Sequence, residues 1–554
     1  MTSYTRRQLF RTGVGALSAA ALIHLSGQDG EQPALASTTK GTALPAAGPS
    51  VARIERINGI PTFIVDGQPF LINGSHLNTW QAYHQDKPVV DFFDWCQRVN
   101  CTAVGMELYW SFIETSEGVY DFSSLNWIIK QSEAHGLKLV LQLYNSNVCG
   151  TIENGSDAHP DPVWVPKYIR EAPDKYQRIV LPPDCEKLYV SSGPPMCPND
   201  PRTLERERKY MVRLADYLRE HDRNRTVIMA QVNNEYVCWV YKGSPEGNFD
   251  WTRVPDGRGV RCICPYCDAK WNAGYGGNCY EFMYDSFADY TRVLSDAFRA
   301  DYPLPLYLNS PGIPPDQIRG YLGKCPNIAI VGIDEVIDPH EPNELCAGQV
   351  CRNIAFAAEV PTQRPKTRFF IDVLPYYFVI GLLGIGHLLW DAPPPDRASE
   401  DEDVSRRYEQ ALYPLKYAQS LIARYRGTAQ LSAWYALRDF ESDYPQSTFV
   451  REGAMTRIES LSNRAYVHDI QIGNRMISVR ASEAGVAIAP SENVLVIGTP
   501  RASIDLKGVR VASVENGQYV GDAWHSMGAF AFEKRADGAR LQIREPSVLR
   551  IQFA

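Results

Sequence analysis

Short apolar segments recur through most of the chain, and most of them end in polar or aromatic residues. Stretches whose apolar positions have helical spacing, such as residues 125–135 and 205–220, separate many of them. Strands that alternate with amphipathic helices predict a parallel sheet, and eight such units over this length predict a closed barrel. The eight predicted strands cover residues 69–76, 102–109, 137–144, 226–235, 305–309, 328–334, 367–372 and 385–391.

The pattern changes after this series of segments. Three prolines at 393–395 and an acidic run at 400–403 interrupt it, and a helical segment at 406–426 completes the barrel. From residue 431 onward, apolar and polar residues alternate between turn signals, as in antiparallel strands. The predicted fold class is therefore α/β, a (β/α)8 TIM barrel over residues 50–427 followed by a small C-terminal antiparallel β-domain over residues 431–554.

The N-terminal residues carry the features of an export signal. Arg6 and Arg7 form a twin-arginine pair, a short apolar stretch follows at 14–25, and residues 34–36 (Ala-Leu-Ala) resemble a cleavage site. The alternative is an ordinary basic start before a short helix. We interpret residues 1–36 as a twin-arginine signal peptide, which predicts a periplasmic or secreted protein. No later apolar run reaches the roughly 18 residues that a membrane helix needs, so no membrane partner is expected for the mature form.

Composition and charge narrow the classes of function. An apolar fraction of 44% and a charged fraction of 22% are typical of a globular protein. The formal net charge of −8 argues against a nucleic-acid partner, because nucleic acids require a positive surface. Aromatic residues make up 11% of the chain, which suits stacking on sugar rings but is common in other large folds. The sequence leaves open whether the chain forms a homo-oligomer.

The strongest candidate for a catalytic group is Glu235. The apolar run at 227–232 leads directly into Asn233, Asn234 and Glu235, which places this carboxyl group at the mouth of the predicted barrel. Cleavage of a glycoside needs one carboxyl group to protonate the leaving oxygen and a second to attack or stabilise the anomeric carbon. Asn234 is suited to bind a sugar hydroxyl beside it. The alternative for Glu235 is a solvated carboxylate at the end of a strand.

The segment around Glu235 resembles the Q-x-E-N-E-Y motif of retaining barrel glycosidases that include the family 35 and family 42 β-galactosidases. It departs from that motif at Asn233, which stands in place of the first glutamate. Residues 109–122 are similar to a W-x-x-x-E-x-x-x-G-x-Y-D-F stretch of the same enzymes, and residues 492–498 resemble their C-terminal β-domain. The resemblance implies an exo-acting glycoside hydrolase with a carbohydrate substrate, a terminal β-linked sugar of the galactose type. The choice of sugar comes from the resemblance alone.

The second carboxyl group is where the sequence departs most from the resemblance. Retaining enzymes of this clan place a glutamate at the end of the seventh strand, and the predicted seventh strand ends at Asp372. An aspartate side chain is one methylene shorter than a glutamate. The distance between the carboxyl groups of Asp372 and Glu235 is therefore expected to increase from the ~5 Å of a retaining enzyme toward the ~6.5–9.5 Å of an inverting one. Glu335, after the predicted sixth strand, is the rival, either as this group or as a substrate ligand. The remaining alternative for Asp372 is a structural carboxylate.

Cysteine spacing indicates a metal site. The chain has 13 cysteines, and Cys262, Cys264 and Cys267 are close enough in sequence for their thiolates to converge on one zinc ion. Cys197 is placed as the upstream ligand of the zinc cluster in family 42 enzymes, so the resemblance implies it as the fourth ligand. Four protein ligands make such a Zn2+ site structural. The alternative is disulfide bonding in an oxidising compartment. No organic cofactor is expected.

Further side chains at predicted strand ends are candidates for substrate binding. Asn145 and His76 are expected to bind sugar hydroxyls, and Trp110 and Trp390 to stack on sugar rings. Each has an ordinary structural alternative, because strand-end polar groups also cap loops and most tryptophans belong to cores. Two other functions remain open beside the β-galactosidase-like one. They are a glycosidase of different sugar or anomeric specificity and a non-catalytic glycan-binding barrel.

Overall fold

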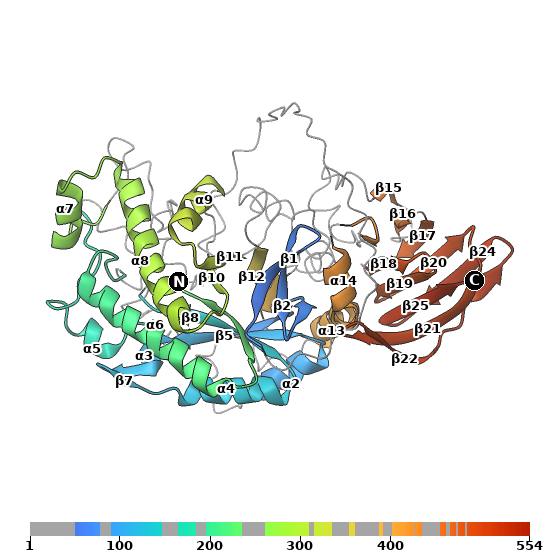
Figure 1. Ribbon diagram of the computed structural model, residues 1–554, viewed down its shortest axis with the longest axis horizontal. Coiled ribbons are helices and arrows are strands. Elements are labelled where there is room, and N and C mark those ends of the chain that lie inside the picture. Colours follow the sequence, from blue (N-terminus) through green and yellow to red (C-terminus); the bar gives the residue numbers. More distant parts are fainter. Residues whose placement is uncertain are drawn as a thin grey trace, which may run out of the picture.

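The structure is a computed structural model in which a parallel barrel lies beside a domain of antiparallel sheets (Figure 1). One buried hydrophobic cluster extends from the barrel into the C-terminal part, which also has a core of its own. The described residues are 50–77, 90–146, 164–183, 195–234, 261–309, 315–334, 354–360, 387–391, 402–426, 428–434, 455–460, 466–472, 475–481, 483 and 485–554.

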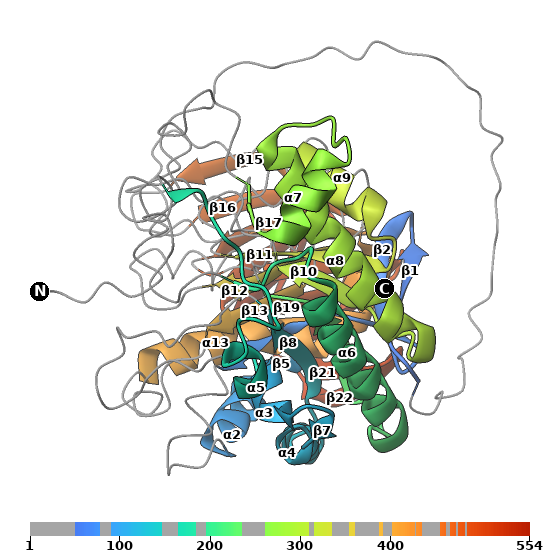
Figure 2. The ribbon, with the colours of Figure 1, turned by 90° about the vertical axis from the view of Figure 1, so that its left-hand side faces the viewer.

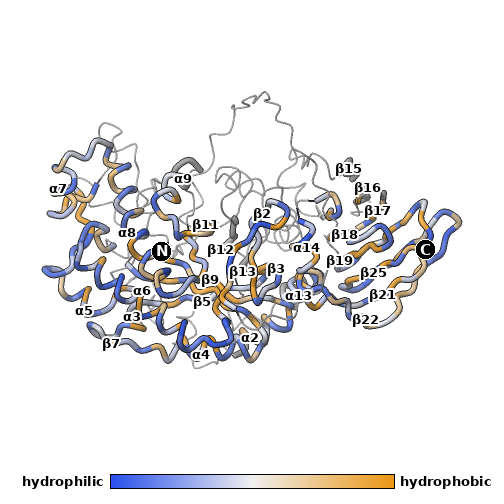
Figure 3. Tube along the Cα trace, viewed as in Figure 1, coloured by the Kyte–Doolittle hydropathy of each residue, from blue (hydrophilic) through white to orange (hydrophobic). Residues whose placement is uncertain are grey.

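The parallel sheet that the sequence predicts is present, and its strands close into a barrel. Neighbouring strands pair in parallel in chain order, and the last strand pairs with the first. The barrel strands are β4 (Asn73–Leu77), β5 (Ala103–Tyr109), β8 (Lys138–Tyr144), β9 (Val227–Gln231), β10 (Leu306–Asn309), β11 (Ile328–Asp334), β12 (Ile354–Val360) and β13 (His387–Asp391). All residues of β5 and β9 are buried, as expected for strands covered on both faces. Figure 3 shows hydrophobic residues where these two strands lie.

The seventh strand of the barrel is not the one predicted. β12 pairs with β11 on one side and β13 on the other, so it holds the seventh place. The segment 367–372, which was assigned to that place, lies outside the described residues. The reason for the error is compositional. β12 reads Ile-Ala-Phe-Ala-Ala-Glu-Val, and its alanines have low strand propensity, whereas residues 369–371 (Phe-Phe-Ile) have a high one.

Helices surround the barrel. The helix α6 begins at Pro201 after the N-cap Asp200, whose side chain accepts a hydrogen bond from the Arg202 backbone. The helix α8 begins with a capping box between Asn278 and Glu281. These two long helices lie side by side (Figure 2). The described helices are α2 (Val90–Arg98), α3 (Trp110–Ile113), α4 (Ser123–Ala134), α5 (Lys167–Arg170), α6 (Pro201–His221), α7 (Pro265–Asn272), α8 (Cys279–Asp301), α9 (Pro315–Lys324), α13 (Glu402–Tyr417) and α14 (Gln419–Tyr425).

A small antiparallel sheet covers the start of the barrel strands. It consists of β1 (Arg53–Ile57), β2 (Ile60–Val65) and β3 (Gln68–Phe70). Phe63 and Val65 of this sheet share a buried cluster with Ala103, Val140 and Ile228, which lie at or near the first residues of their strands. The amino-terminal end of the barrel is therefore packed, and polar side chains gather at the opposite end. A two-stranded ribbon, β6 (Glu114–Ser116) and β7 (Val119–Tyr120), follows α3.

The C-terminal part contains two six-stranded antiparallel sheets, in agreement with the alternating sequence pattern. The first has the order β14 (Leu431–Trp434), β18 (Gly485–Ser491), β19 (Val494–Thr499), β25 (Ser547–Phe553), β21 (Val511–Val520) and β22 (Ala523–Ala529). The second has the order β15 (Met455–Ser460), β16 (Tyr466–Ile472), β17 (Arg475–Ala481), β20 (Ala502–Lys507), β24 (Gly538–Ile543) and β23 (Glu533–Arg535).

The central strands of the first sheet, β18, β19 and β25, are buried on both faces. Along β25, Val548 belongs to the core shared with the barrel helices, whereas its neighbour Leu549 belongs to the core of the C-terminal domain. In β19, Val496 likewise belongs to the core shared with the barrel helices, and Ile497 belongs to the core of the C-terminal domain. Successive side chains of a strand point to opposite faces, so one sheet packs against its partner sheet and against α13 and α14. No helix within the described part of the chain is long and apolar enough to cross a membrane.

Candidate active site and cysteine cluster

The carboxyl end of β9 is held by a set of amide hydrogen bonds. Gln231 donates from Nε2 to Oδ1 of Asn234 over 2.8 Å, and Tyr307 of β10 donates from its hydroxyl to Oε1 of Gln231 over 3.3 Å. The backbone N–H of Asn234 donates to the carbonyl oxygen of Leu143 over 3.0 Å. Asn234 is buried. Glu235 itself lies just outside the described residues, but the backbone that leads to it is fixed.

Asn145 joins the end of β8 to the end of β9. Its Nδ2 donates to the carbonyl oxygen of Val232 over 3.0 Å, and its side chain is fully buried. The Oδ1 atom has no hydrogen-bond partner among the described residues. The structure therefore places Asn145 beside Asn234, as the sequence predicts for strand-end residues, and ties it to the backbone that precedes Glu235. Its expected contact with a sugar stays a prediction.

A second polar group lies between β4 and β5. His76 Nε2 is 3.9 Å from Oε1 of Glu107, and the hydroxyl of Tyr109 donates a hydrogen bond to Oε2 of the same carboxylate. Tyr109 also belongs to an aromatic cluster with Tyr144 and Trp164, at the ends of β5 and β8. His76 was predicted as a site residue from the sequence, whereas Glu107 was not. A charged residue in the otherwise apolar strand Ala-Val-Gly-Met-Glu-Leu-Tyr is the signal that identifies it.

Trp110 is a core residue, which corrects its assignment as a stacking platform. Its side chain is fully buried, its ring stacks on Tyr210 with centroids 5.9 Å apart, and its Nε1 donates to Glu114 over 2.8 Å. A sugar cannot reach a ring face that protein atoms cover. Glu114 also accepts hydrogen bonds from Arg206 and from the backbone of Gly118, so this part of the motif is structural. Trp390 lies in β13, in register with Ser75 of β4.

The seventh strand carries a glutamate near its end. Glu359 pairs in register with Asp334, which is the last residue of β11. Glu335 and Asp372 lie outside the described residues. Glu359 was not predicted from the sequence, because the seventh strand was placed further along the chain. A glutamate just before Val360 and Pro361, at the end of an apolar run, is the signal that was available.

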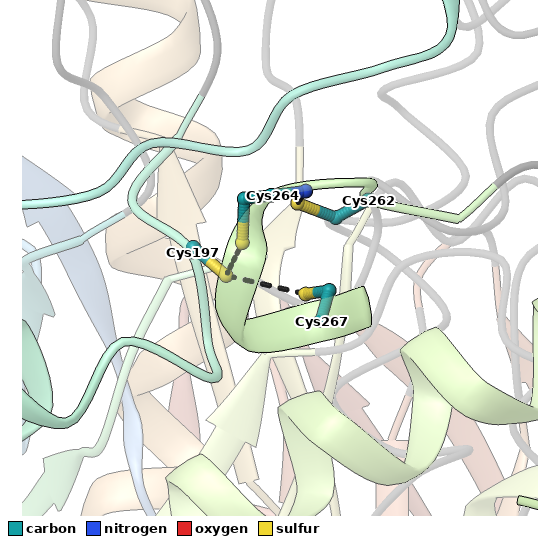
Figure 4. Close-up of side chains that lie close together, drawn as sticks. All are labelled: Cys197, Cys262, Cys264 and Cys267. Carbon is teal, nitrogen blue, oxygen red and sulfur yellow. Dashed lines mark hydrogen bonds between the residues drawn. The ribbon is translucent and has the colours of Figure 1, made fainter. Parts of the chain in front are cut away.

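The four predicted metal ligands converge. The Sγ atoms of Cys197, Cys262, Cys264 and Cys267 all lie within 4.8 Å of one another, and all four side chains are buried (Figure 4). Cys197 Sγ is 3.4 Å from Cys264 Sγ and 3.4 Å from Cys267 Sγ. Tetrahedral zinc with Zn–S bonds of about 2.3 Å places its sulfurs about 3.8 Å apart, so the donor set fits this ion. All four cysteines are free.

Backbone and side-chain N–H groups surround the sulfurs. Asn199 donates from Nδ2 to Cys267 Sγ over 3.2 Å, and Val180 donates from its backbone to Cys262 Sγ over 3.3 Å. Hydrogen bonds from the other three cysteines lower the pKa of the Cys264 thiol, whereas burial raises the pKa of the Cys197 thiol. Donors that point at the sulfurs stabilise thiolates, which are the form that binds metal.

A closed parallel barrel with amide and carboxyl side chains at the carboxyl ends of its strands defines a class, the barrel enzymes. The family comes from the sequence of this region. Residues 85–253 match the profile of glycoside hydrolase family 42, described as β-galactosidase. This segment includes both strand ends that carry Asn145 and Asn234, and also Glu235. The resemblance to the family 35 and family 42 enzymes is therefore confirmed over this segment, and it supports a glycoside hydrolase.

Individual proteins resemble the same region. β-Galactosidase BgaB of Geobacillus kaustophilus is 29% identical over 146 residues, which make up 26% of this chain and 18% of that protein. β-Galactosidase BgaB of Geobacillus sp. (strain Y412MC61) matches to the same extent. The aligned stretch thus spans less than a fifth of these relatives.

Solved structures show only a distant likeness. Endo-glycoceramidase II from Rhodococcus sp. is 12% identical, with a TM-score of 0.41 and coverage of 88% of this chain and 98% of that chain. The exo-β-1,4-mannosidase Op5Man5 from Opitutaceae bacterium strain TAV5 is 14% identical, with a TM-score of 0.36 and coverage of 60% and 54%. Both scores are below 0.5, so neither likeness bears on the function of this chain.

Proposed function

We propose that the protein is an exo-acting glycoside hydrolase that removes a terminal β-linked sugar, of the galactose type, by a two-carboxylate mechanism. The observation that carries this proposal is the family 42 match over residues 85–253, which includes Asn234 and Glu235. The hydrogen bonds of Gln231 and Asn145 at the same strand ends support it, because a catalytic carboxyl group has to project from a fixed backbone. Glu235 is the proposed general acid and base.

The proposed second carboxyl group is Glu359 rather than Asp372. Asp372 was chosen because its segment was taken as the seventh strand, and β12 holds that place instead. Glu359 restores the glutamate that the resemblance requires near the end of this strand, without the shorter reach of an aspartate. Glu335, which follows the sixth strand in the sequence, remains the alternative.

In the proposed reaction, protonated Glu235 gives its proton to the leaving oxygen while the carboxylate of Glu359 attacks the anomeric carbon. Water then hydrolyses the glycosyl-enzyme, with Glu235 acting as base, and the product keeps the anomeric configuration. Asn234 is proposed to hydrogen-bond the sugar beside the reacting carbon. The roles require two carboxyl groups about 5 Å apart.

The test is a screen of the mature protein against nitrophenyl glycosides, followed by single variants. Glu235→Gln should lower turnover of an unactivated galactoside by about 10²–10⁴-fold. Glu359→Ala should abolish turnover, and azide should restore part of it because the anion enters the vacated carboxylate site. Asp372→Ala and Glu335→Ala serve as matched controls, and rescue by azide in either of them would move the second carboxylate there. Absence of any hydrolysis by the wild type would leave a glycan-binding barrel.

We also propose that Cys197, Cys262, Cys264 and Cys267 hold one structural zinc ion. The convergence of four buried thiols and the N–H donors around them support this assignment. With four protein ligands the ion has no position for substrate, so its contribution is to hold two loops together. Export through residues 1–36 to the periplasm or the medium remains a proposal as well, to be tested by the N-terminal sequence of the protein recovered from those fractions.

A further inference from the structure

A buried glutamate that the proposed mechanism does not use lies beside the carboxyl ends of β8 and β9. Glu207 belongs to α6, and none of its surface is exposed. The described residues offer it no cation, and each hydrogen bond to it comes from an uncharged side chain. A buried carboxyl group without a positive partner is costly, so it persists only where it is well bonded. The identity of those partners indicates its role.

The partners come from the two strand ends that lead to the catalytic segment. The hydroxyl of Ser146, just after β8, donates to Oε2 of Glu207, and Asn233, just after β9, donates from Nδ2 to Oε1 over 3.3 Å. The side chain of Asn145 acts on the same carboxyl group by lowering its pKa. The hydroxyl of Tyr290 on α8 donates to Oε2 over 2.6 Å. One side chain therefore links the ends of β8 and β9 to two helices.

We propose that Glu207 is a positioning residue of the active site, which fixes the end of β9 and so the place from which Glu235 acts. Asn233 is two residues before Glu235 in the chain, so a movement of the Asn233 backbone is transmitted along the chain to the segment that carries the proposed proton donor. The inference rests on the proposed function, in which Glu235 is the proton donor. It adds a residue outside the barrel strands to the machinery that places this donor.

Neighbouring hydrogen bonds explain how the loss of the Glu207 side chain would affect the backbone at the ends of β8 and β9. The N–H of Asn234 donates to Leu143 O over 3.0 Å, and the N–H of Met196 donates to Ser146 O over 3.0 Å. Both bonds lie within one residue of a Glu207 partner. Burial raises the pKa of Glu207 to about 8, which agrees with a carboxyl group that is closed off from water. Without this group, the polar side chains of Ser146 and Asn233 would lose a shared partner in a buried place.

The test compares Glu207→Leu with Glu207→Gln. Glutamine has the size of glutamate, and its side-chain oxygen still accepts hydrogen bonds from Ser146 and Tyr290. The side-chain amide of the glutamine can donate to Oδ1 of Asn233, an atom that has no partner among the described residues. Leucine fills the space without any of these bonds. We expect Glu207→Leu to lower kcat/KM at least tenfold on phenyl β-galactoside and to lower it much less on 2,4-dinitrophenyl β-galactoside, whose leaving group needs no proton. The ratio kcat/KM is compared because it reports formation of the glycosyl-enzyme and excludes the later step in which Glu235 acts as base. Glu207→Gln should recover most of the loss.

Hydrogen exchange provides a readout that does not require catalysis. In Glu207→Leu, amides of peptides spanning residues 143–146 and 231–234 should exchange roughly tenfold faster or more than in the wild type. Exchange in the C-terminal half of α6 should be unchanged. Glu220→Leu, on the exposed side of the same helix, is the matched control and should change neither exchange nor kcat. If Glu207→Leu proves too unstable to purify, Ser146→Ala removes one partner and should show the same pattern more weakly.

The outcomes separate the inference from the proposed function. Equal losses on both galactosides in Glu207→Leu, or the same loss in Glu207→Gln, would overturn the positioning role. Unchanged exchange at residues 231–234 would also overturn it. If the wild type hydrolyses no galactoside, the proposed function fails, and faster exchange in Glu207→Leu alone would still support the placement of the strand ends by Glu207.

Discussion

At the scale of single residues, the buried pair of Arg206 and Glu114 has a large expected effect on stability. Glu114 is fully buried and bonds Arg206, the Trp110 ring nitrogen and the backbone of Gly118. Arg206→Leu would leave this carboxylate buried without a cation. We expect a loss of about 3–5 kcal/mol in the free energy of unfolding, measured by urea denaturation. Arg208→Leu, which breaks an exposed pair with Glu205 on the same helix, should cost less than about 1 kcal/mol.

The raised pKa of Glu207 predicts a pH dependence of stability. Its pKa is about 8 in the folded protein, against an ordinary value of 4.5, because burial disfavours the charged form. Between these values the folded chain keeps a proton that the unfolded chain releases, so stability falls as the pH rises, by up to about 1.4 kcal/mol per pH unit. Tyr210 and Tyr290, the ionisable neighbours, have pKa values raised well above 10 and do not titrate in this window.

Glu207→Gln should remove this pH dependence. The difference in unfolding free energy between Glu207→Gln and the wild type should therefore shift in favour of the variant by about 1 kcal/mol or more from pH 5 to pH 7. Urea denaturation at each pH measures it. Parallel stability curves for the two proteins would show that Glu207 is not protonated in the fold. The exposed Glu220→Gln on the same helix is expected to follow the wild type at every pH.

At the scale of elements, the cysteine cluster predicts a metal-dependent link between two loops. Cys197 lies before α6, and the other three cysteines lie at the start of α7. We expect about one zinc ion per chain, and Cys264→Ser should lower both the metal content and the thermal stability. Elemental analysis and thermal denaturation of protein purified without added metal measure these. Cys325→Ser, at a buried cysteine outside the cluster, is the control for metal content. Absence of zinc with disulfides among the four would contradict the proposal.

Most barrel strands were predictable because each is an apolar run that ends in polar residues. The run before Asn145 and the run before Asn234 show this pattern, and they are β8 and β9. The seventh strand was not predictable in the same way. Two neighbouring apolar segments, 354–360 and 367–372, could each have formed the seventh strand. The alanine-rich segment 354–360 forms it, because pairing with β11 and β13 outweighs intrinsic strand propensity.

The site was predictable only where the chain itself places residues together. Asn234 precedes Glu235 directly, and the three clustered cysteines are close in sequence. The Glu207 partners come from three separate segments, and no spacing in the sequence connects them. Trp110 was misassigned because a tryptophan at a predicted strand end was interpreted as a platform for stacking on a sugar ring. Its burial against Tyr210 depends on how α6 packs, and the sequence around Trp110 does not contain that information.

At the scale of the whole molecule, the barrel and the C-terminal domain should unfold together. Val548 and Val496 belong to the same buried cluster as residues of α13 and α14. Val548→Asp would place a charge in this shared core, and we expect one calorimetric transition whose midpoint is lower by roughly 5 °C or more. Val520→Asp is the matched control, because Val520 is 58% exposed, and it should leave the midpoint nearly unchanged. Two separate transitions in the wild type would contradict a shared core.

The cysteine cluster also sets an order of events during synthesis. Cys197 and Cys267 are 70 residues apart, so the cluster cannot close until the ribosome has released that whole interval. At about 5–20 residues per second, the delay is roughly 4–14 seconds. The interval contains α6 and β9, while β10 to β13 have not yet been made. Under the proposed zinc assignment, a shortage of zinc at that moment would leave the nascent chain with the first half of its barrel synthesised but without the metal link, which would increase its exposure to chaperones and proteases.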